Sequence, residues 1–80
     1  MTRVRLQAAH KAARDAGRTK LSFRLFDALY ASTRYGGTSE ATNGNACYTL
    51  QRKGLVRVEY PFAYATVAGH AEVKSVLWGP

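Results

Sequence analysis

Residues 50–58, Leu-Gln-Arg-Lys-Gly-Leu-Val-Arg-Val, mark a change from helical to extended chain. Upstream of this stretch apolar residues recur at the spacing of a helix, whereas downstream they alternate with polar residues and are β-branched. Gly54 separates the two patterns and occupies the C′ position, where glycine tolerates a positive φ. The stretch therefore predicts a helix that ends near residue 53 and a strand over residues 55–60.

The helix that ends at this junction is expected over residues 44–53, with two different sides. Ala46, Cys47 and Leu50 form one narrow apolar side. The opposite side carries Asn45, Tyr48, Thr49 and Arg52. One apolar and one polar side is typical of a helix that docks on a core and leaves the other side open to a ligand. Asn43-Gly44 predicts a turn, with Asn43 as the N-cap, so residues 38–42 leave room for only about one turn of helix.

Two further helices are predicted upstream. Residues 22–34 have Ser22 as N-cap and an apolar arc that belongs in the core. That arc consists of Phe23, Leu25, Phe26, Leu29 and Tyr30. Residues 2–16 are rich in alanine, and Gly17 ends this helix. Its polar face is expected to carry Arg3, Gln7, His10, Lys11 and Arg14.

Downstream of Gly54 the chain is expected to form a small antiparallel sheet. Val56, Val58 and Tyr60 would lie on one face of the first strand, and Pro61 ends or turns it. Residues 64–68 and 72–78 resemble two more strands, with residues 68–71 as a hairpin tip. The predicted class is α+β, with three or four helices followed by a small antiparallel sheet and without a long C-terminal helix. At 80 residues, one domain is the natural interpretation.

The charge is strongly positive and unevenly distributed. Twelve Lys and Arg against five Asp and Glu give a net charge of +7. Residues 1–34 carry a net charge of +6, and residues 35–80 carry +1. A basic surface attracts polyanions such as DNA, although it also simply keeps a protein soluble.

Several function classes are not expected. Cys47 is the single cysteine, which excludes an intrachain disulfide, and His10 and His70 have no Cys or acidic cluster nearby for a metal site. Neither a glycine-rich phosphate loop nor a nucleophile–base motif is present, so we expect no enzyme activity and no cofactor. No long apolar stretch predicts a signal peptide or membrane helix, so a cytoplasmic protein is expected.

Residues 50–58 resemble the junction between recognition helix and wing in winged helix-turn-helix proteins, in the style of short bacterial and phage regulators. Taken with the element order, the resemblance covers about residues 21–78. It implies a single winged-helix domain over residues 1–80. Within it, residues 1–17 would form a basic N-terminal helix, 21–54 a helical core with a recognition helix at 43–53, and 55–78 the wing strands, with the wing itself at 64–76. The segment available for the second helix of the helix-turn-helix is shorter than the family pattern.

The resemblance also implies which residues contact DNA. Asn45, Tyr48, Thr49 and Arg52 would enter the major groove, where Asn suits adenine, Arg suits guanine and the Thr methyl suits thymine. A backbone phosphate would be bound near Asn43 at the helix N-terminus, and His70 and Lys74, at or near the wing, would reach the backbone or the minor groove. Lys53 flanks the polar face and is a further candidate for contact with DNA. Apart from the resemblance, Arg18 and Lys20 in the connection before the second helix are candidates for phosphate contact. For each of these residues the alternative is a helix cap or a solvated charge.

Three functions therefore remain open. The first is a sequence-specific DNA-binding transcriptional regulator, repressor-like, that acts as a monomer or a homodimer. The second is a protein-interaction module that binds a host or partner protein through exposed aromatic residues such as Tyr35, Tyr48, Phe62 and Tyr64. The third is RNA binding by the basic N-terminal helix.

Overall fold

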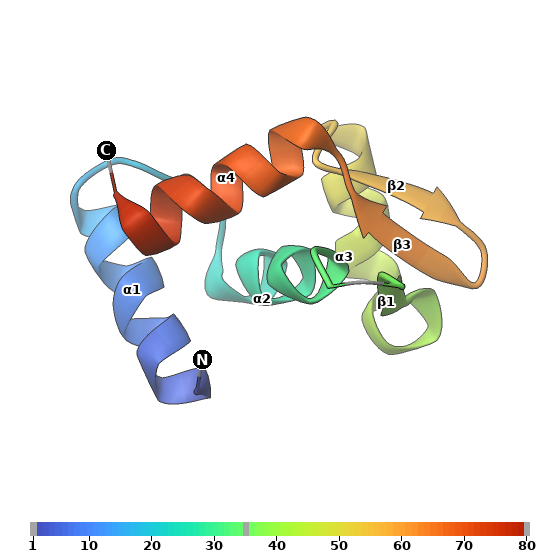
Figure 1. Cartoon of the computed structure of the whole chain (residues 1–80), viewed down its shortest axis with the longest axis horizontal. Helices are drawn as coiled ribbons and strands as arrows, with labels where there is room; N and C mark the ends of the chain where they lie inside the picture. The colour runs from blue at the N-terminus through green and yellow to red at the C-terminus, as the bar shows by residue number, and fades with distance from the viewer. Residues whose placement is uncertain (1, 35, 80) are drawn as a thin grey trace.

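The computed structural model describes the backbone of residues 2–34 and 36–79, and the side chains of all of these except residues 40–43. Over the described residues the chain forms four helices and a three-stranded antiparallel sheet (Figure 1). In chain order the elements are α1 (Arg3–Asp15), α2 (Phe23–Ser32), β1 (Thr38–Ser39), α3 (Glu40–Arg52), β2 (Val56–Glu59), β3 (Phe62–Ala65) and α4 (Val67–Trp78). The predicted α+β class is confirmed, and the arrangement is compatible with a winged-helix layout.

Short polar side chains fix where three of the helices begin. Ser22 Oγ accepts a hydrogen bond from the backbone N–H of Leu25, as predicted, and Thr2 and Thr66 cap α1 and α4 in the same way. α1 is followed by Gly17 with a φ of 74°, which confirms the predicted end of this helix.

The sheet has the order β1-β3-β2, and its two longer strands form a hairpin. Val56 pairs with Ala65 and Val58 with Ala63, so these residues share the face that packs on the helices. Arg57 and Glu59 point to the other face and are exposed. The alternation predicted for residues 56–59 is therefore confirmed, and Pro61 lies in the turn between the strands.

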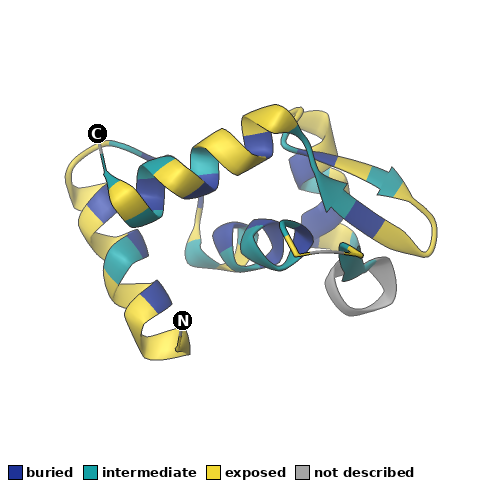
Figure 2. Cartoon of the chain, viewed as in Figure 1, coloured by how far each residue is buried: buried dark blue, intermediate teal, exposed yellow. Residues whose placement is uncertain are grey.

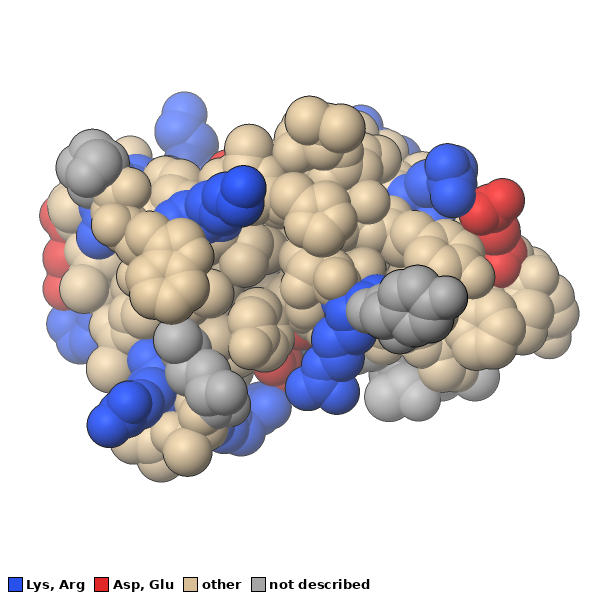
Figure 3. Space-filling view, in the orientation of Figure 1, with Lys and Arg blue, Asp and Glu red and all other residues tan. Residues whose placement is uncertain are grey.

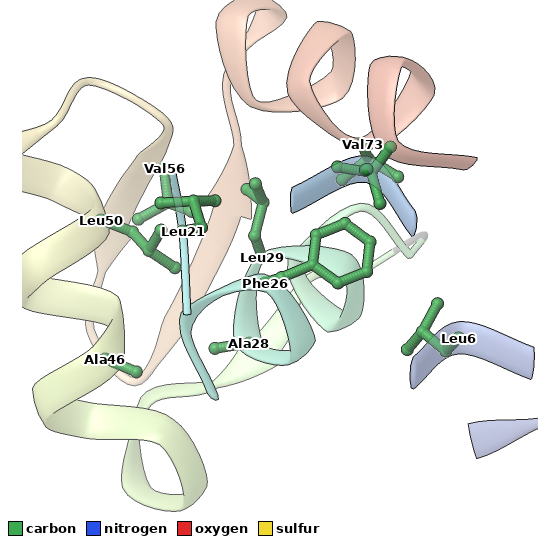
Figure 4. Packing of buried hydrophobic residues seen from close by; sticks show 11 residues of the cluster. Leu6, Leu21, Phe26, Ala28, Leu29, Ala46, Leu50, Val56 and Val73 are labelled. Carbon is green, nitrogen blue, oxygen red and sulfur yellow. The ribbon is translucent and has the colours of Figure 1, made fainter. Parts of the chain in front are cut away.

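The core is centred on α2, whose residues are buried or half-buried except for Arg24 (Figure 2). Phe26 and Leu29 of α2, Leu50 of α3 and Val76 of α4 are fully buried. Figure 4 shows that Leu29 and Phe26 lie between Leu50 on one side and Val73 of α4 on the other. Leu50 therefore anchors α3 on the core, as the sequence predicted.

The prediction for the C-terminal part is wrong after residue 65. Residues 67–78 form α4 instead of a hairpin tip and strand, so the hairpin covers residues 56–65 and neither 64–76 nor 55–78 forms the wing. Two features explain the helix: Thr66 caps its N-terminus through its side chain, and Gly69 lets α4 lie directly on the chain at Leu55. A Cβ at residue 69 would lie 2.0 Å from the backbone oxygen of Leu55. The glycine thus serves a close approach between two segments rather than a turn.

The prediction for residues 38–44 is also wrong. Thr38 and Ser39 form β1, and α3 begins directly at Glu40. Asn43-Gly44 consequently lies inside the helix, and the N-cap is Ser39, which makes no side-chain cap hydrogen bond. Within the described part of the chain no separate helix lies between α2 and α3, so the turn of helix for which residues 38–42 left room is not formed.

His10 was predicted on the polar face of the first helix, but it is buried. Its Nε2 lies 2.8 Å from the backbone oxygen of Leu21, to which it is hydrogen-bonded. Because a carbonyl oxygen can only accept, Nε2 is the donor. The imidazole also stacks on Phe26, with ring centroids 5.3 Å apart. His10 therefore joins α1 to the segment that leads into α2.

We expect His10→Ala to lower the free energy of unfolding by about 2 kcal/mol, because it removes the ring contact and leaves a buried carbonyl without its partner. Gln7→Ala, an exposed change on the same helix, should stay within about 0.5 kcal/mol of the wild type. Urea denaturation of both variants measures the difference. Equal stabilities would show that α1 is not held through His10.

Candidate nucleic-acid interface

The exposed face of α3 is the first part of the candidate interface. Ala46, Cys47 and Leu50 are buried, and α3 packs with this side against α2 and β2. Because successive residues turn by about 100° around a helix, Asn45, Tyr48, Thr49 and Arg52 fall together on the opposite side. Asn45, Tyr48 and Arg52 are exposed and Thr49 is half-buried. The structure thus brings these four predicted site residues onto one face, which we call the α3 face.

Hydrogen bonds give the α3 face a partly fixed arrangement. The hydroxyl of Thr49 donates to the backbone oxygen of Asn45 at 3.0 Å. Arg52 Nη2 donates to the same hydroxyl at 3.4 Å, a long and weak hydrogen bond. The guanidinium of Arg52 is therefore directed along the helix, and its other N–H groups remain available to a ligand.

No carboxylate of the described side chains forms an ion pair with Arg52. The described salt bridges join Arg3 to Asp27, Lys11 to Asp15 and Arg57 to Glu59, each at 2.9 Å. Glu72 is engaged elsewhere, by the hydroxyl of Thr19. Arg52 thus presents its full positive charge beside three hydrogen-bonding side chains, the combination that reads base edges in DNA complexes.

The β2–β3 hairpin offers a different surface. Arg57 is paired with Glu59 and lies over the ring of Tyr64 at 5.7 Å from its centroid, so its charge is largely compensated. Tyr60 is 84% exposed at the tip, and Phe62 is 44% exposed beside it. The outer hairpin surface is therefore aromatic and close to neutral.

The exposure of Tyr60 was missed by the sequence analysis, which placed it on the same face as Val56 and Val58. β2 ends at Glu59, so the alternation stops one residue earlier than assumed. The neighbouring Pro61 was the available signal, because a strand that ends before a proline no longer fixes the direction of the next side chain.

His70 and Lys74 do not lie on the hairpin. Both are exposed residues of α4, one turn apart. Their predicted place on a wing is wrong, because the segment that carries them is helical, and their predicted contact with DNA stays untested. The side chain of Asn43 lies outside the described residues, as does Tyr35, so their predicted contacts stay untested.

Arg18, Lys20 and Lys53 are brought together although they come from distant parts of the sequence. All three line one open depression between the α1–α2 connection, the end of α3 and α4. Sequence periodicity carries no signal for such an arrangement, since it depends on how α1 and α4 pack.

The cations of α1 lie away from the α3 face. Figure 1 places α1 at one end of the molecule and α3 with the hairpin at the other. On the face seen in Figure 3, Lys and Arg side chains lie apart from one another rather than in one patch. Arg3 and Lys11 are also paired with carboxylates, which weakens the RNA-binding alternative based on this helix.

The described residues include no cluster of three or more His, Cys, Asp or Glu side chains arranged to bind a metal ion. No described helix is long and apolar enough to cross a membrane. Comparison of the chain with protein-family models, curated proteins and solved structures found no match.

Proposed function

We propose that the protein binds double-stranded DNA through the α3 face, and that it is a cytoplasmic transcriptional regulator of the winged-helix type that acts by occupying its site. The observation that carries this proposal is the exposed, uncompensated Arg52 beside Asn45, Tyr48 and Thr49. Arg binds the O6 and N7 atoms of guanine through two hydrogen bonds, and Asn binds the N6 and N7 atoms of adenine in the same way.

The shape of the molecule is consistent with this proposal. α3 has 13 residues, which corresponds to a length of about 20 Å. A major groove about 12 Å wide admits one helix of this kind. α3 lies with the hairpin at one end of the molecule, and its apolar side is held by α2 and β2, so its polar side faces away from the core (Figure 1).

The charge pattern limits how the binding works. The cations of α1 lie at the far end of the molecule, remote from the α3 face (Figure 1). We therefore expect a modest number of phosphate contacts and a correspondingly moderate salt dependence. Repression would follow from exclusion of other proteins from the site, by a monomer or by two copies on a palindromic sequence.

The test is selection of random double-stranded DNA by the purified protein at moderate salt, followed by sequencing. An enriched motif is expected, with a guanine and an adenine among its fixed bases. Retention of DNA without any enriched sequence would contradict sequence-specific recognition. No retention at low salt would contradict DNA binding altogether.

The hairpin favours a second candidate function, binding of a protein partner. Tyr60 and Phe62 are large, exposed and not surrounded by free cations, and aromatic side chains are enriched in protein–protein hot spots. A protein partner that covers this hairpin is compatible with a DNA-binding α3 face.

The double variant Tyr60→Ser/Phe62→Ser separates the two uses of the surface. We expect it to keep the affinity of the selected duplex within about threefold, because the hairpin tip offers no charge to a phosphate. Fluorescence anisotropy with labelled duplex measures this. A loss of tenfold or more would place the hairpin in the DNA interface and remove the argument for a protein partner there.

A further inference from the structure

The depression that collects Arg18, Lys20 and Lys53 has a volume of about 370 Å³ and opens to solvent. Its other polar lining residues are Thr19 and Glu72. Three positive charges therefore face one negative charge in a concave surface. Such a surface attracts anions more strongly than the same charges would on a convex one, because its walls concentrate the field.

Two of these four charged side chains, Arg18 and Glu72, already form hydrogen bonds within the protein. Arg18 Nη1 donates a hydrogen bond to the backbone oxygen of Ser75 in α4. Thr19, which is buried, donates from its hydroxyl to Glu72 Oε2 at 2.6 Å. These contacts tie the α1–α2 connection to α4, so Arg18 and Glu72 hold the depression together.

The other two charges are free. Lys20 and Lys53 are exposed, and neither forms an ion pair with a carboxylate of the described side chains. Glu72 lines the same depression but is only half-exposed and is held by the buried Thr19. The two lysines thus form the more exposed part of the lining, which we call the mouth of the depression, and Glu72 forms a less exposed part.

Lys53 also connects this depression to the α3 face. It follows Arg52 directly and is displaced from it by about 100° around the helix axis, so it flanks the face instead of lying on it. When a helix occupies a groove of DNA, the phosphate backbones run along the flanks of the helix. A phosphate beside the C-terminal end of α3 would meet Lys53 first.

We propose that Lys20 and Lys53 together bind one phosphate of the DNA backbone at the mouth of this depression; this rests on the proposed function of the α3 face. A backbone phosphate stays at the mouth, because it is part of a large duplex. A small free anion would have to approach Glu72 to fill the depression, and the carboxylate repels it. A free anion that stayed at the mouth would meet the same two lysines, and what favours the backbone as the source is the position of Lys53 at the end of α3, beside the α3 face.

The test compares the salt dependence of duplex binding for the wild type, Lys20→Gln/Lys53→Gln and a control, Arg5→Gln/Arg14→Gln, which removes the same charge from two exposed positions of α1. One lost phosphate contact should reduce the slope of log K against log salt by about 0.9 and weaken all duplexes by a similar factor. The control should keep the wild-type slope. Equal slopes for all three proteins would overturn the proposal.

A titration of the protein with inorganic phosphate in the absence of DNA, monitored by amide NMR shifts, tests whether the depression binds a free anion instead. Shifts confined to residues 17–21 and 53–55, together with an unchanged duplex slope in the lysine variant, would assign the depression to a free anion and overturn the backbone contact. Duplex binding that depends on Arg52 but not on the two lysines would leave the function of the α3 face intact and remove only this inference. Absence of any duplex binding would remove both.

Discussion

Replacement of Gly69 by alanine should lower the free energy of unfolding by about 3 kcal/mol, a large part of the stability of an 80-residue domain. An added Cβ would lie 2.0 Å from the backbone oxygen of Leu55 and 3.1 Å from Leu29 Cδ1. The backbone oxygen cannot rotate away, so α4 would have to move outward. That movement breaks two hydrogen bonds at the start of α4. The backbone N–H of Thr66 donates to the backbone oxygen of Leu55 at 3.0 Å, and the Thr66 hydroxyl donates to the backbone oxygen of Gly54 at 2.7 Å.

Gly44→Ala is the matched control, because it adds the same methyl group inside another helix. No atom lies within 4 Å of the added Cβ in the described part of the chain. Alanine is favoured over glycine in a helix interior by about 1 kcal/mol, so this variant should be more stable than the wild type. Urea denaturation of the two variants should give shifts of opposite sign. A Gly69→Ala protein as stable as the wild type would show that α4 does not lie on Leu55.

The role of Gly69 also explains why the C-terminal part of the fold was not predictable. A glycine among small residues is compatible both with a hairpin tip and with a helix that closely approaches another segment. Which of the two forms depends on the segment against which the glycine packs. That segment, around Leu55, is distant in sequence. Val73 and Val76 are β-branched, which favours a strand, yet they lie one turn apart and are both buried on the same side of α4.

The parts that were predictable depend on local chemistry. Ser22 caps α2 through its own side chain, and Gly54, with a φ of 78°, ends α3 where the sequence indicated. Asn43-Gly44 is the exception among local signals. The strand pairing of Thr38 with Ala63 starts α3 at Glu40, so the helix continues through a dipeptide that would otherwise form a turn.

In the candidate site, too, local sequence pattern predicts one part, and the other part depends on packing between distant segments. The α3 face follows from helical spacing around a buried Leu50, so its four members could be named from the sequence. That Lys20 and Lys53 line one depression could not be predicted, because it depends on how the α1–α2 connection lies relative to the end of α3. His10 was assigned to the polar face because its type is usually polar, while the stacking partner that buries it, Phe26, comes from another helix.

Arg52→Ala should weaken binding of the selected duplex about 10- to 100-fold, since one two-hydrogen-bond contact with guanine contributes about 1–3 kcal/mol of discrimination. The side chain is exposed and its one described hydrogen bond, to Thr49, is weak, so stability should stay within about 0.5 kcal/mol of the wild type. Any loss of binding then reports on recognition rather than on folding.

The decisive feature is the pattern across duplexes. If Arg52 reads a base, the variant should lose its preference at one position of the motif and keep the others. Arg5→Ala removes the same charge from an exposed position on α1, at the far end of the molecule, and should weaken every duplex slightly and equally (Figure 1). Binding curves for duplexes altered one position at a time measure both effects. If Arg52→Ala instead weakens all duplexes by the same factor, Arg52 contacts a phosphate, and sequence reading must be assigned to Asn45, Tyr48 or Thr49.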